Sequence, residues 1–138
     1  MHIDRDTPAR FDISYNAEHR FMFVVATGFI RHTDQLAMSD QVDQFSKTVP
    51  SPTRLVLDYN QSDTTAFELM QFMKHMGSIL KLMEEADCRE LIIINNTTMW
   101  GRFVSQLSIH PQYGGRRMRL CLTYDDMLAY VIAHPLIP

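Results

Sequence analysis

The stretch Arg54-Leu55-Val56-Leu57-Asp58-Tyr59 decides how this chain folds. It is a short apolar run that follows Pro50-Ser51-Pro52, and such a run is typical of a buried strand. A second run of this kind, Leu-Ile-Ile-Ile, lies within Glu90–Asn95. Between the two runs, residues 65–86 carry apolar side chains at helical spacing. Short buried strands separated by helices predict a mainly parallel sheet with helices packed on it.

Before this central unit, the sequence predicts a β-hairpin and a helix. Phe11–Tyr15 alternates apolar and polar residues, and Phe21–Thr27 is strongly apolar, with a five-residue polar turn between them. Two adjacent strands joined by a short loop indicate an antiparallel hairpin, which Gly28 ends or bends. Thr33 and Asp34 are typical N-cap residues, so we expect a helix from there to just before Pro50.

After Asn95 the pattern predicts two more helices and one strand. A short helix over 98–110, a loop over 111–115, a strand over 116–123 and a helix over 124–134 complete the order ββαβαβαβα. We therefore expect one α/β domain over 11–134, a flexible leader over 1–10 and a short tail over 135–138. The sheet is expected to be mixed, mainly parallel, with the hairpin at its start.

Composition narrows the classes of protein to which the chain can belong. Its 138 residues are 46% hydrophobic and 21% charged, which is enough apolar surface for a full core and argues against disorder. A net charge of −3 gives no long-range attraction to nucleic acid. Cys88 and Cys121 have no CxxC partner, so we expect free thiols in a reducing, cytoplasmic compartment. No apolar run reaches the roughly 20 residues that a membrane span requires.

The predicted helix over 65–86 has an unusually wide apolar arc. The ordinary interpretation is burial against both the sheet and a neighbouring helix, and the alternative is that its edge forms a homodimer contact. Phe67 and Met70 project toward the polar side at the helix start. Two such side chains beside the strand-to-helix turn suggest a surface that docks a partner.

Residue patterns for catalysis and metal binding are missing from the sequence. None of the six histidines stands at metal-ligand spacing from another ligand-type residue. The chain has no GxSxG elbow and no phosphate-binding glycine loop. We therefore expect no metal, no cofactor and no enzymatic activity.

The order of elements resembles the SpoIIAA-like, or STAS-like, family. The opening hairpin, the strands around 55–58 and 91–94 and the closing run Tyr124-Asp125-Asp126-Met127-Leu128-Ala129-Tyr130 carry the resemblance over roughly residues 10–134. In anti-sigma antagonists of this family, a partner kinase phosphorylates the second hydroxyl of an Asp-Ser-Ser-Gly loop. Asp63-Thr64-Thr65-Ala66 stands in the similar place, so the resemblance implies that Thr65 matches the phosphorylated residue.

Three departures from the family pattern favour a simpler role for Thr65. Threonines replace the serines, Ala66 replaces the glycine, and the loop after Asp58 is shorter. Thr65 and Glu68 also fit a capping box, in which a hydroxyl and a carboxylate three residues apart satisfy helix amides. The sequence thus predicts Thr65 as an N-cap, with phosphorylation as the competing hypothesis.

Two functions remain after this reasoning. The first is a non-enzymatic regulatory or protein-interaction module that uses the turn from residue 60 to residue 65 and the exposed helix start; its expected contact residues are Asn60, Asp63, Thr64, Thr65, Phe67 and Met70. The alternative is a binding protein for a small apolar or lipid-like ligand. Its pocket would be lined by Met22, Met70, Met73, Met76, Met83, Met99 and Phe103.

Overall fold

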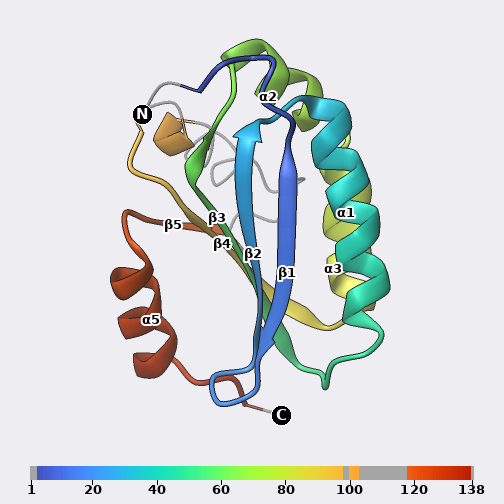
Figure 1. Cartoon of the computed structure of the whole chain (residues 1–138). Helices are drawn as coiled ribbons and strands as arrows, with labels where there is room; N and C mark the ends of the chain where they lie inside the picture. The colour runs from blue at the N-terminus through green and yellow to red at the C-terminus, as the bar shows by residue number, and fades with distance from the viewer. Residues whose placement is uncertain (1–2, 98–99, 103–117, 138) are drawn as a thin grey trace.

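The computed structural model describes residues 3–97, 100–102 and 118–137 and shows a sheet covered by helices on both faces (Figure 1). The five strands lie in the order β1-β2-β3-β4-β5. The elements, in chain order, are β1 (Arg10–Asn16), β2 (Phe21–Phe29), α1 (His32–Ser46), β3 (Thr53–Asp63), α2 (Ala66–Met73), α3 (Met76–Glu85), β4 (Cys88–Ile94), β5 (Met118–Cys121) and α5 (Tyr124–Ala133).

Strand pairing confirms the predicted mixed, mainly parallel sheet. β1 and β2 form the expected antiparallel hairpin, whereas β2, β3, β4 and β5 pair in parallel. β3 lies at the centre, where Leu55 stands beside Met22 on one side and Leu91 on the other. The run that we took as decisive is therefore the middle strand, paired on both edges.

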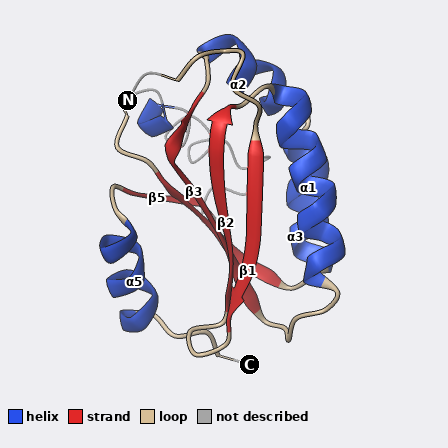
Figure 2. Ribbon diagram, viewed as in Figure 1, coloured by secondary structure: helices blue, strands red, loops and turns tan. Residues whose placement is uncertain are grey.

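The two faces of the sheet support two separate cores, because successive side chains of a strand point to opposite faces. Leu55 and Leu57 face α1, α2 and α3, while Val56 faces α5 (Figure 2). Cys88 and Cys121 belong to different cores, and both side chains are buried.

The predicted helix over 65–86 is wrong in one respect, because the structure divides it into α2 and α3. The helix breaks at Lys74 and His75, where the His75 amide donates to the Phe72 carbonyl at 2.9 Å, a tighter bond than α-helical pairing. Leu69, Phe72 and Met76 nevertheless keep their three- and four-residue spacing on the core side. Hydrophobic periodicity cannot reveal a helix break that preserves the spacing of the buried residues.

The ends of several elements also differ from the predictions. The strand that we expected to end at Tyr59 continues to Asp63, so most of the predicted turn from residue 60 to residue 65 is strand. α1 begins at His32 rather than behind Thr33, and Asp34 instead accepts the Arg31 amide at 2.8 Å. Of the predicted helix over 98–110, residues 100–102 are helical and the rest lies outside the described residues.

β2 does not end at Gly28 but passes through it to Phe29, after a register shift between Val25 and Thr27. Gly28 has a φ of +84°, and a Cβ there would lie 2.0 Å from the Pro8 carbonyl oxygen. The Phe29 amide donates to the Thr7 carbonyl at 3.1 Å. Only glycine fits this close approach of two backbones, which places residues 7–9 against the end of the strand.

A cluster of charged groups joins α5 to its face of the sheet. Glu90 accepts from Arg54 Nε at 3.0 Å and from the Tyr130 hydroxyl at 2.8 Å. Arg54 also donates to the His134 carbonyl, and Arg119 lies over the Tyr130 ring, 3.9 Å from its centroid. The Arg54 and Glu90 side chains are only 5% and 11% exposed, so their mutual pairing is needed to offset desolvation.

Candidate functional site

The start of α2 is built from helix-capping interactions. The Thr65 hydroxyl accepts from the Glu68 amide at 3.3 Å, which confirms the N-cap interpretation. The Glu68 carboxylate does not complete the capping box. Instead it crosses to α1, where it accepts from the His32 amide at 2.7 Å and contacts His32 Nδ1 at 2.5 Å. The first turns of α1 and α2 thus share one carboxylate.

Electrostatics favour the ionised form of Glu68. Desolvation alone would raise the pKa of this carboxyl, but hydrogen bonds from the His32 amide and ring, with the charge of Arg31, lower it overall. A phosphate on Thr65 would meet this anion at the same helix terminus. The geometry therefore offers no support for phosphorylation at Thr65, and that hypothesis is not carried further.

The remaining predicted contact residues do not gather into one site. The Thr64 side chain is buried and donates to the Ile30 carbonyl at 2.6 Å, while the Asp63 carboxylate accepts the Thr64 amide at 2.9 Å. Asn60 turns toward the other strand ends, donating to the Leu122 carbonyl and accepting from the Asn96 amide, both at 3.2 Å. These hydrogen bonds hold the ends of the strands together.

Phe67 and Met70 differ from these residues, because both are exposed as predicted. Their exposed fractions are 62% and 64%. They stand three residues apart in α2 and therefore on one side of the helix. Two large apolar side chains in this position form a small surface that could contact another protein.

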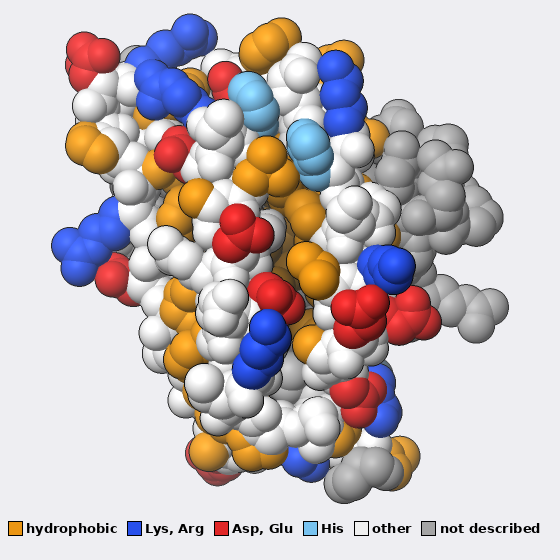
Figure 3. Space-filling model, turned by 90° about the vertical axis from the view of Figure 1, so that its right-hand side faces the viewer, with side chains coloured by type: hydrophobic (Ala, Val, Ile, Leu, Met, Phe, Trp, Pro, Cys, Tyr) orange, Lys and Arg blue, Asp and Glu red, His pale blue; other side chains and the backbone are white. Residues whose placement is uncertain are grey.

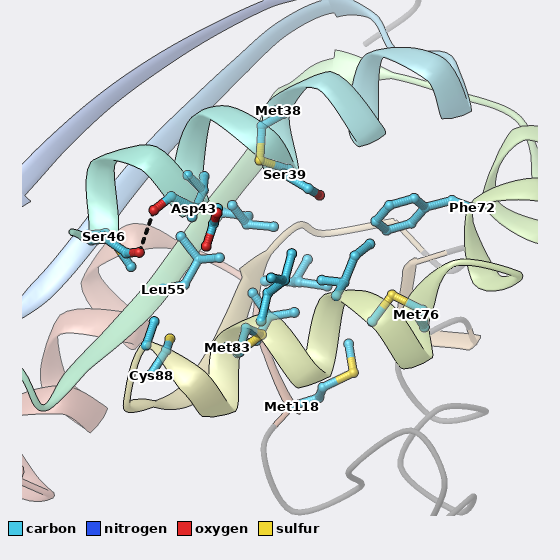
Figure 4. Close-up of a pocket in the computed structure, with 18 of the residues that line it drawn as sticks. Met38, Ser39, Asp43, Ser46, Leu55, Phe72, Met76, Met83, Cys88 and Met118 are labelled. Carbon is cyan, nitrogen blue, oxygen red and sulfur yellow. Dashed lines mark hydrogen bonds between the residues drawn. The ribbon is translucent and has the colours of Figure 1, made fainter.

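An apolar cavity of about 60 Å³ lies between α1 and α3, above the sheet (Figure 4). We call it the α1–α3 slot, and its walls include Met38 and Val42 of α1, Met76, Ile79 and Met83 of α3, and Phe72 of α2. Its floor includes Leu55, Leu57 and Leu91 of the sheet. Figure 3 shows hydrophobic side chains in a hollow on this face, with acidic side chains along the rim.

Among the described residues that line the slot, hydroxyl and carboxylate groups stand in two places. Ser39, Asp43 and Ser46 of α1 stand along one edge. Tyr59 contributes to the wall, donates to buried Gln35 at 2.6 Å and stacks on Trp100 with ring centroids 4.2 Å apart. Burial raises the pKa of Tyr59 above its ordinary value, against the opposing effect of the Gln35 bond, so the phenol is neutral at physiological pH.

The methionine-lined pocket that we predicted is right in part. Met22, Met76 and Met83 line the slot, whereas Met70 is exposed and Met73 is not among the lining residues. Met99 and Phe103 lie outside the described residues. The sequence reasoning missed the contribution of α1. A usable signal was present, because Met38 and Val42 form a four-residue step beside Ser39 and Asp43.

Metal and membrane features can be assessed over the described ranges. Among residues 3–97, 100–102 and 118–137, no cluster of three or more His, Cys, Asp or Glu side chains is placed to hold a metal ion. Within the same part of the chain, no helix has both the length and the apolar character needed to cross a bilayer.

Fold and slot together define an α/β module with an open apolar cavity between two helices and a sheet. Among solved structures, the chain is similar to the crystal structure of an uncharacterised DUF3478-family protein with a SpoIIAA-like fold from Shewanella loihica PV-4. The alignment covers 95% of this chain and 99% of that one, with a TM-score of 0.56 and 14% sequence identity. The chain therefore has a SpoIIAA-like fold. No protein-family model and no curated protein sequence matches it.

Proposed function

We propose that this chain is a non-enzymatic binding module whose α1–α3 slot holds a small apolar or lipid-like ligand. The observation that carries the proposal is the open, almost wholly apolar cavity of about 60 Å³. That volume is several times the roughly 10–15 Å³ that admits one water molecule, but water needs two to four polar partners to reside in a cavity. The slot therefore suits apolar atoms better than water.

Energetics support an apolar occupant. An empty cavity costs about 24 cal/mol per Å³, so a void of this size costs the folded state about 1.5 kcal/mol. An apolar ligand that fills it would recover contacts of this order. Met38, Met76 and Met83 allow the walls to adapt, because an unbranched thioether side chain changes shape at low energetic cost.

The chemistry of the slot supports binding without catalysis. Among the described lining residues, the titratable groups are those of Asp43, Tyr59 and Cys88, and they come from three different elements. The phenol of Tyr59 is held neutral by burial, and the hydroxyls of Ser39 and Ser46 donate to carbonyls of their own helix. None of these is an activated nucleophile beside a general base.

A fluorescent apolar dye tests this proposal. N-phenyl-1-naphthylamine should bind the wild-type protein with an increase in emission. Ser39→Phe places a ring at the slot edge and should weaken dye binding about tenfold or more, because the ring occupies the space of the ligand. Ser78→Phe makes the same change on the exposed side of α3 and should leave binding unchanged. Absence of dye binding to the wild type, or equal weakening by both substitutions, would contradict the proposal.

A second candidate function, docking of a protein or a second copy of this chain, is favoured by the exposure of Phe67 and Met70. It could operate together with the slot, because Phe72 of the same helix lines the cavity. Light scattering at increasing protein concentration tests the homodimer. Phe67→Ser or Met70→Ser should lower the dimer fraction, whereas Ile132→Ser, at an equally apolar exposed site on α5, should not. A monomer at every concentration would count against self-association.

A further inference from the structure

The outer edge of β1 is open to another strand. β1 lies at one edge of the sheet, and within the described part of the chain it pairs only with β2. Seven residue pairs, from Arg10–Thr27 to Asn16–Phe21, follow one another without a register shift, and Figure 1 shows no described helix across the strand. Alternate backbone amides and carbonyls of β1 therefore point away from β2 without a partner strand.

β1 also lacks the features that usually keep an edge strand from pairing with another chain. Such features are a proline, a β-bulge or a lysine in the strand. The sequence of β1 contains no proline and no lysine, and its ladder with β2 has no bulge. Its two charged side chains offset each other, because Arg10 Nη2 lies 3.3 Å from Asp12 Oδ1. The edge is therefore regular and close to neutral.

Apolar surface accompanies the unpaired backbone. Phe11, Ile13 and Tyr15 point to the same face of the sheet and pack against the larger core, but each side chain is only partly buried. A second strand beside β1 would remove more of this apolar surface from water. Hydrogen bonding and apolar burial therefore favour the same occupant, an extended strand with apolar side chains on alternate positions.

The sequence of β1 is complementary to itself when two copies lie antiparallel about Ile13. Every residue of the strand then has a partner, with aromatic opposite aromatic and carboxylate opposite hydroxyl. The pairs are Phe11 with Tyr15, Asp12 with Ser14, Arg10 with Asn16 and Ile13 with its own counterpart. Aromatic and hydrogen-bonded pairs directly opposite each other stabilise antiparallel strands, and no like charges meet in this register.

Neighbouring registers are less favourable. Pairing about Asp12 would place this carboxylate directly opposite its own counterpart, which is destabilising. Pairing about Phe11 would bring Pro8, which has no amide hydrogen, opposite Ser14 and shorten the ladder. The register about Ile13 avoids both costs.

We propose that the outer edge of β1 binds a second copy of this chain, whose own β1 adds antiparallel about Ile13. The contact uses the same surface on both copies, so it closes at a dimer. It involves none of the residues that line the α1–α3 slot, and it therefore stands independently of ligand binding there. One pair of strands is a small interface, so we expect a dissociation constant in the micromolar range or weaker.

Two substitutions at exposed Ser14 test the proposal with opposite expected signs, because Ser14 faces Asp12 twice in each dimer. Ser14→Asp should raise the dimer dissociation constant about fivefold, and Ser14→Lys should lower it about fivefold. Sedimentation velocity over a range of concentrations measures both. Ser78→Asp makes the same charge change on the exposed side of α3 and should have no effect. A wild type that is monomeric at every concentration, or shifts of the same sign for both Ser14 variants, would overturn the proposal.

A charge exchange tests the register. Asp12→Lys combined with Ser14→Asp again places unlike charges opposite each other and should restore the wild-type dissociation constant to within about twofold. Failure of the double variant to recover would overturn pairing about Ile13. The exposed pair Phe67 and Met70 is the rival surface for self-association. A dimer that Phe67→Ser dissolves and that both Ser14 variants leave intact would overturn the β1 edge in favour of α2.

Discussion

The two faces of the sheet are covered in different ways. Three helices cover one face over an apolar core, and α1 and α3 leave a cavity of about 60 Å³ between them. In the described part of the chain, α5 covers the other face. There Phe21, Val56 and Met127 pack closely, and a charged cluster around Glu90 fixes the helix to the strands. The comparison separates a face that contains a cavity from a face that is held by close packing and charged groups.

Breaking the charged cluster should have the largest effect. Glu90→Ala leaves the guanidinium of Arg54 buried without its carboxylate, which should lower the free energy of unfolding by about 3–5 kcal/mol. Urea denaturation followed by circular dichroism measures the loss. If the alanine variant does not fold, Glu90→Gln should show a smaller loss of about 1–3 kcal/mol.

An exposed ion pair is the control for this prediction. Asp12→Ala removes the ion-pair partner of Arg10. The Asp12 side chain is 60% exposed and that of Arg10 is 74% exposed, so the loss should change stability by less than about 0.5 kcal/mol. A loss below about 1 kcal/mol for Glu90→Ala would mean that the cluster around Glu90 does not stabilise the α5 face as we argue.

The second-largest effect should come from adding one methylene group to each face of the sheet, which should change stability by different amounts. Val56→Ile adds it to the close-packed α5 side, where Val56 is fully buried, and should cost about 1–3 kcal/mol by overpacking. Val42→Ile adds it to the wall of the slot, where space exists, and should be neutral or stabilise by up to about 1 kcal/mol. Thermal unfolding of both variants measures the difference. Equal losses would mean that the slot cannot accept additional apolar atoms.

Sequence patterns predicted the strands and helices better than the helix break and the order of strands in the sheet. The apolar runs around Val56 and Ile92 predicted the parallel strands, because burial on both faces leaves no polar alternation. The break at Lys74 and His75 could not be predicted, since Phe72 and Met76 keep the spacing of one continuous helix. The order of strands in the sheet could not be predicted either, because hydrophobic periodicity carries no information about which strands are neighbours.

For the candidate site too, the sequence predicted local features but not the contacts between distant segments. Local chemistry identified Thr65 as a cap and Phe67 as an exposed residue. It could not show that Asn60 and Thr64 are occupied in holding strand ends together, because those bonds join residues 34 to 62 positions apart in the chain. The slot depends on how far α1 stands from α3, which is a property of the whole fold.

Two threonine caps give a matched pair across the sheet. Thr65 begins α2 and Thr123 begins α5, and each hydroxyl accepts a backbone amide, from Glu68 at 3.3 Å and Asp126 at 3.1 Å. Alanine at either position should cost about 1 kcal/mol. Hydrogen exchange should report the loss locally, in α2 for Thr65→Ala and in α5 for Thr123→Ala. Faster exchange in both helices for either variant would mean that the two faces do not respond separately.

The smallest expected effect is a pH dependence that belongs to the slot face. Because the pKa of Glu68 is lowered in the folded chain, ionised Glu68 stabilises the fold above its unfolded-state pKa, and this contribution is lost as the pH falls through the lower, folded-state value. The difference in unfolding free energy between wild type and Glu68→Gln should therefore be below about 1 kcal/mol at neutral pH and approach a constant, smaller value in acid. Urea titrations from neutral to strongly acidic pH measure it.

A control variant decides whether that pH dependence comes from the bonds between α1 and α2. Asp40→Asn removes a carboxylate from the exposed side of α1, and its effect on stability should vary less with pH than that of Glu68→Gln. His32→Ala removes the ring contact but keeps the amide that donates to Glu68, so it should reduce the pH dependence only in part. If Asp40→Asn instead matches Glu68→Gln at every pH, the effect is one of net charge. The Glu68 carboxylate would then not couple the starts of α1 and α2.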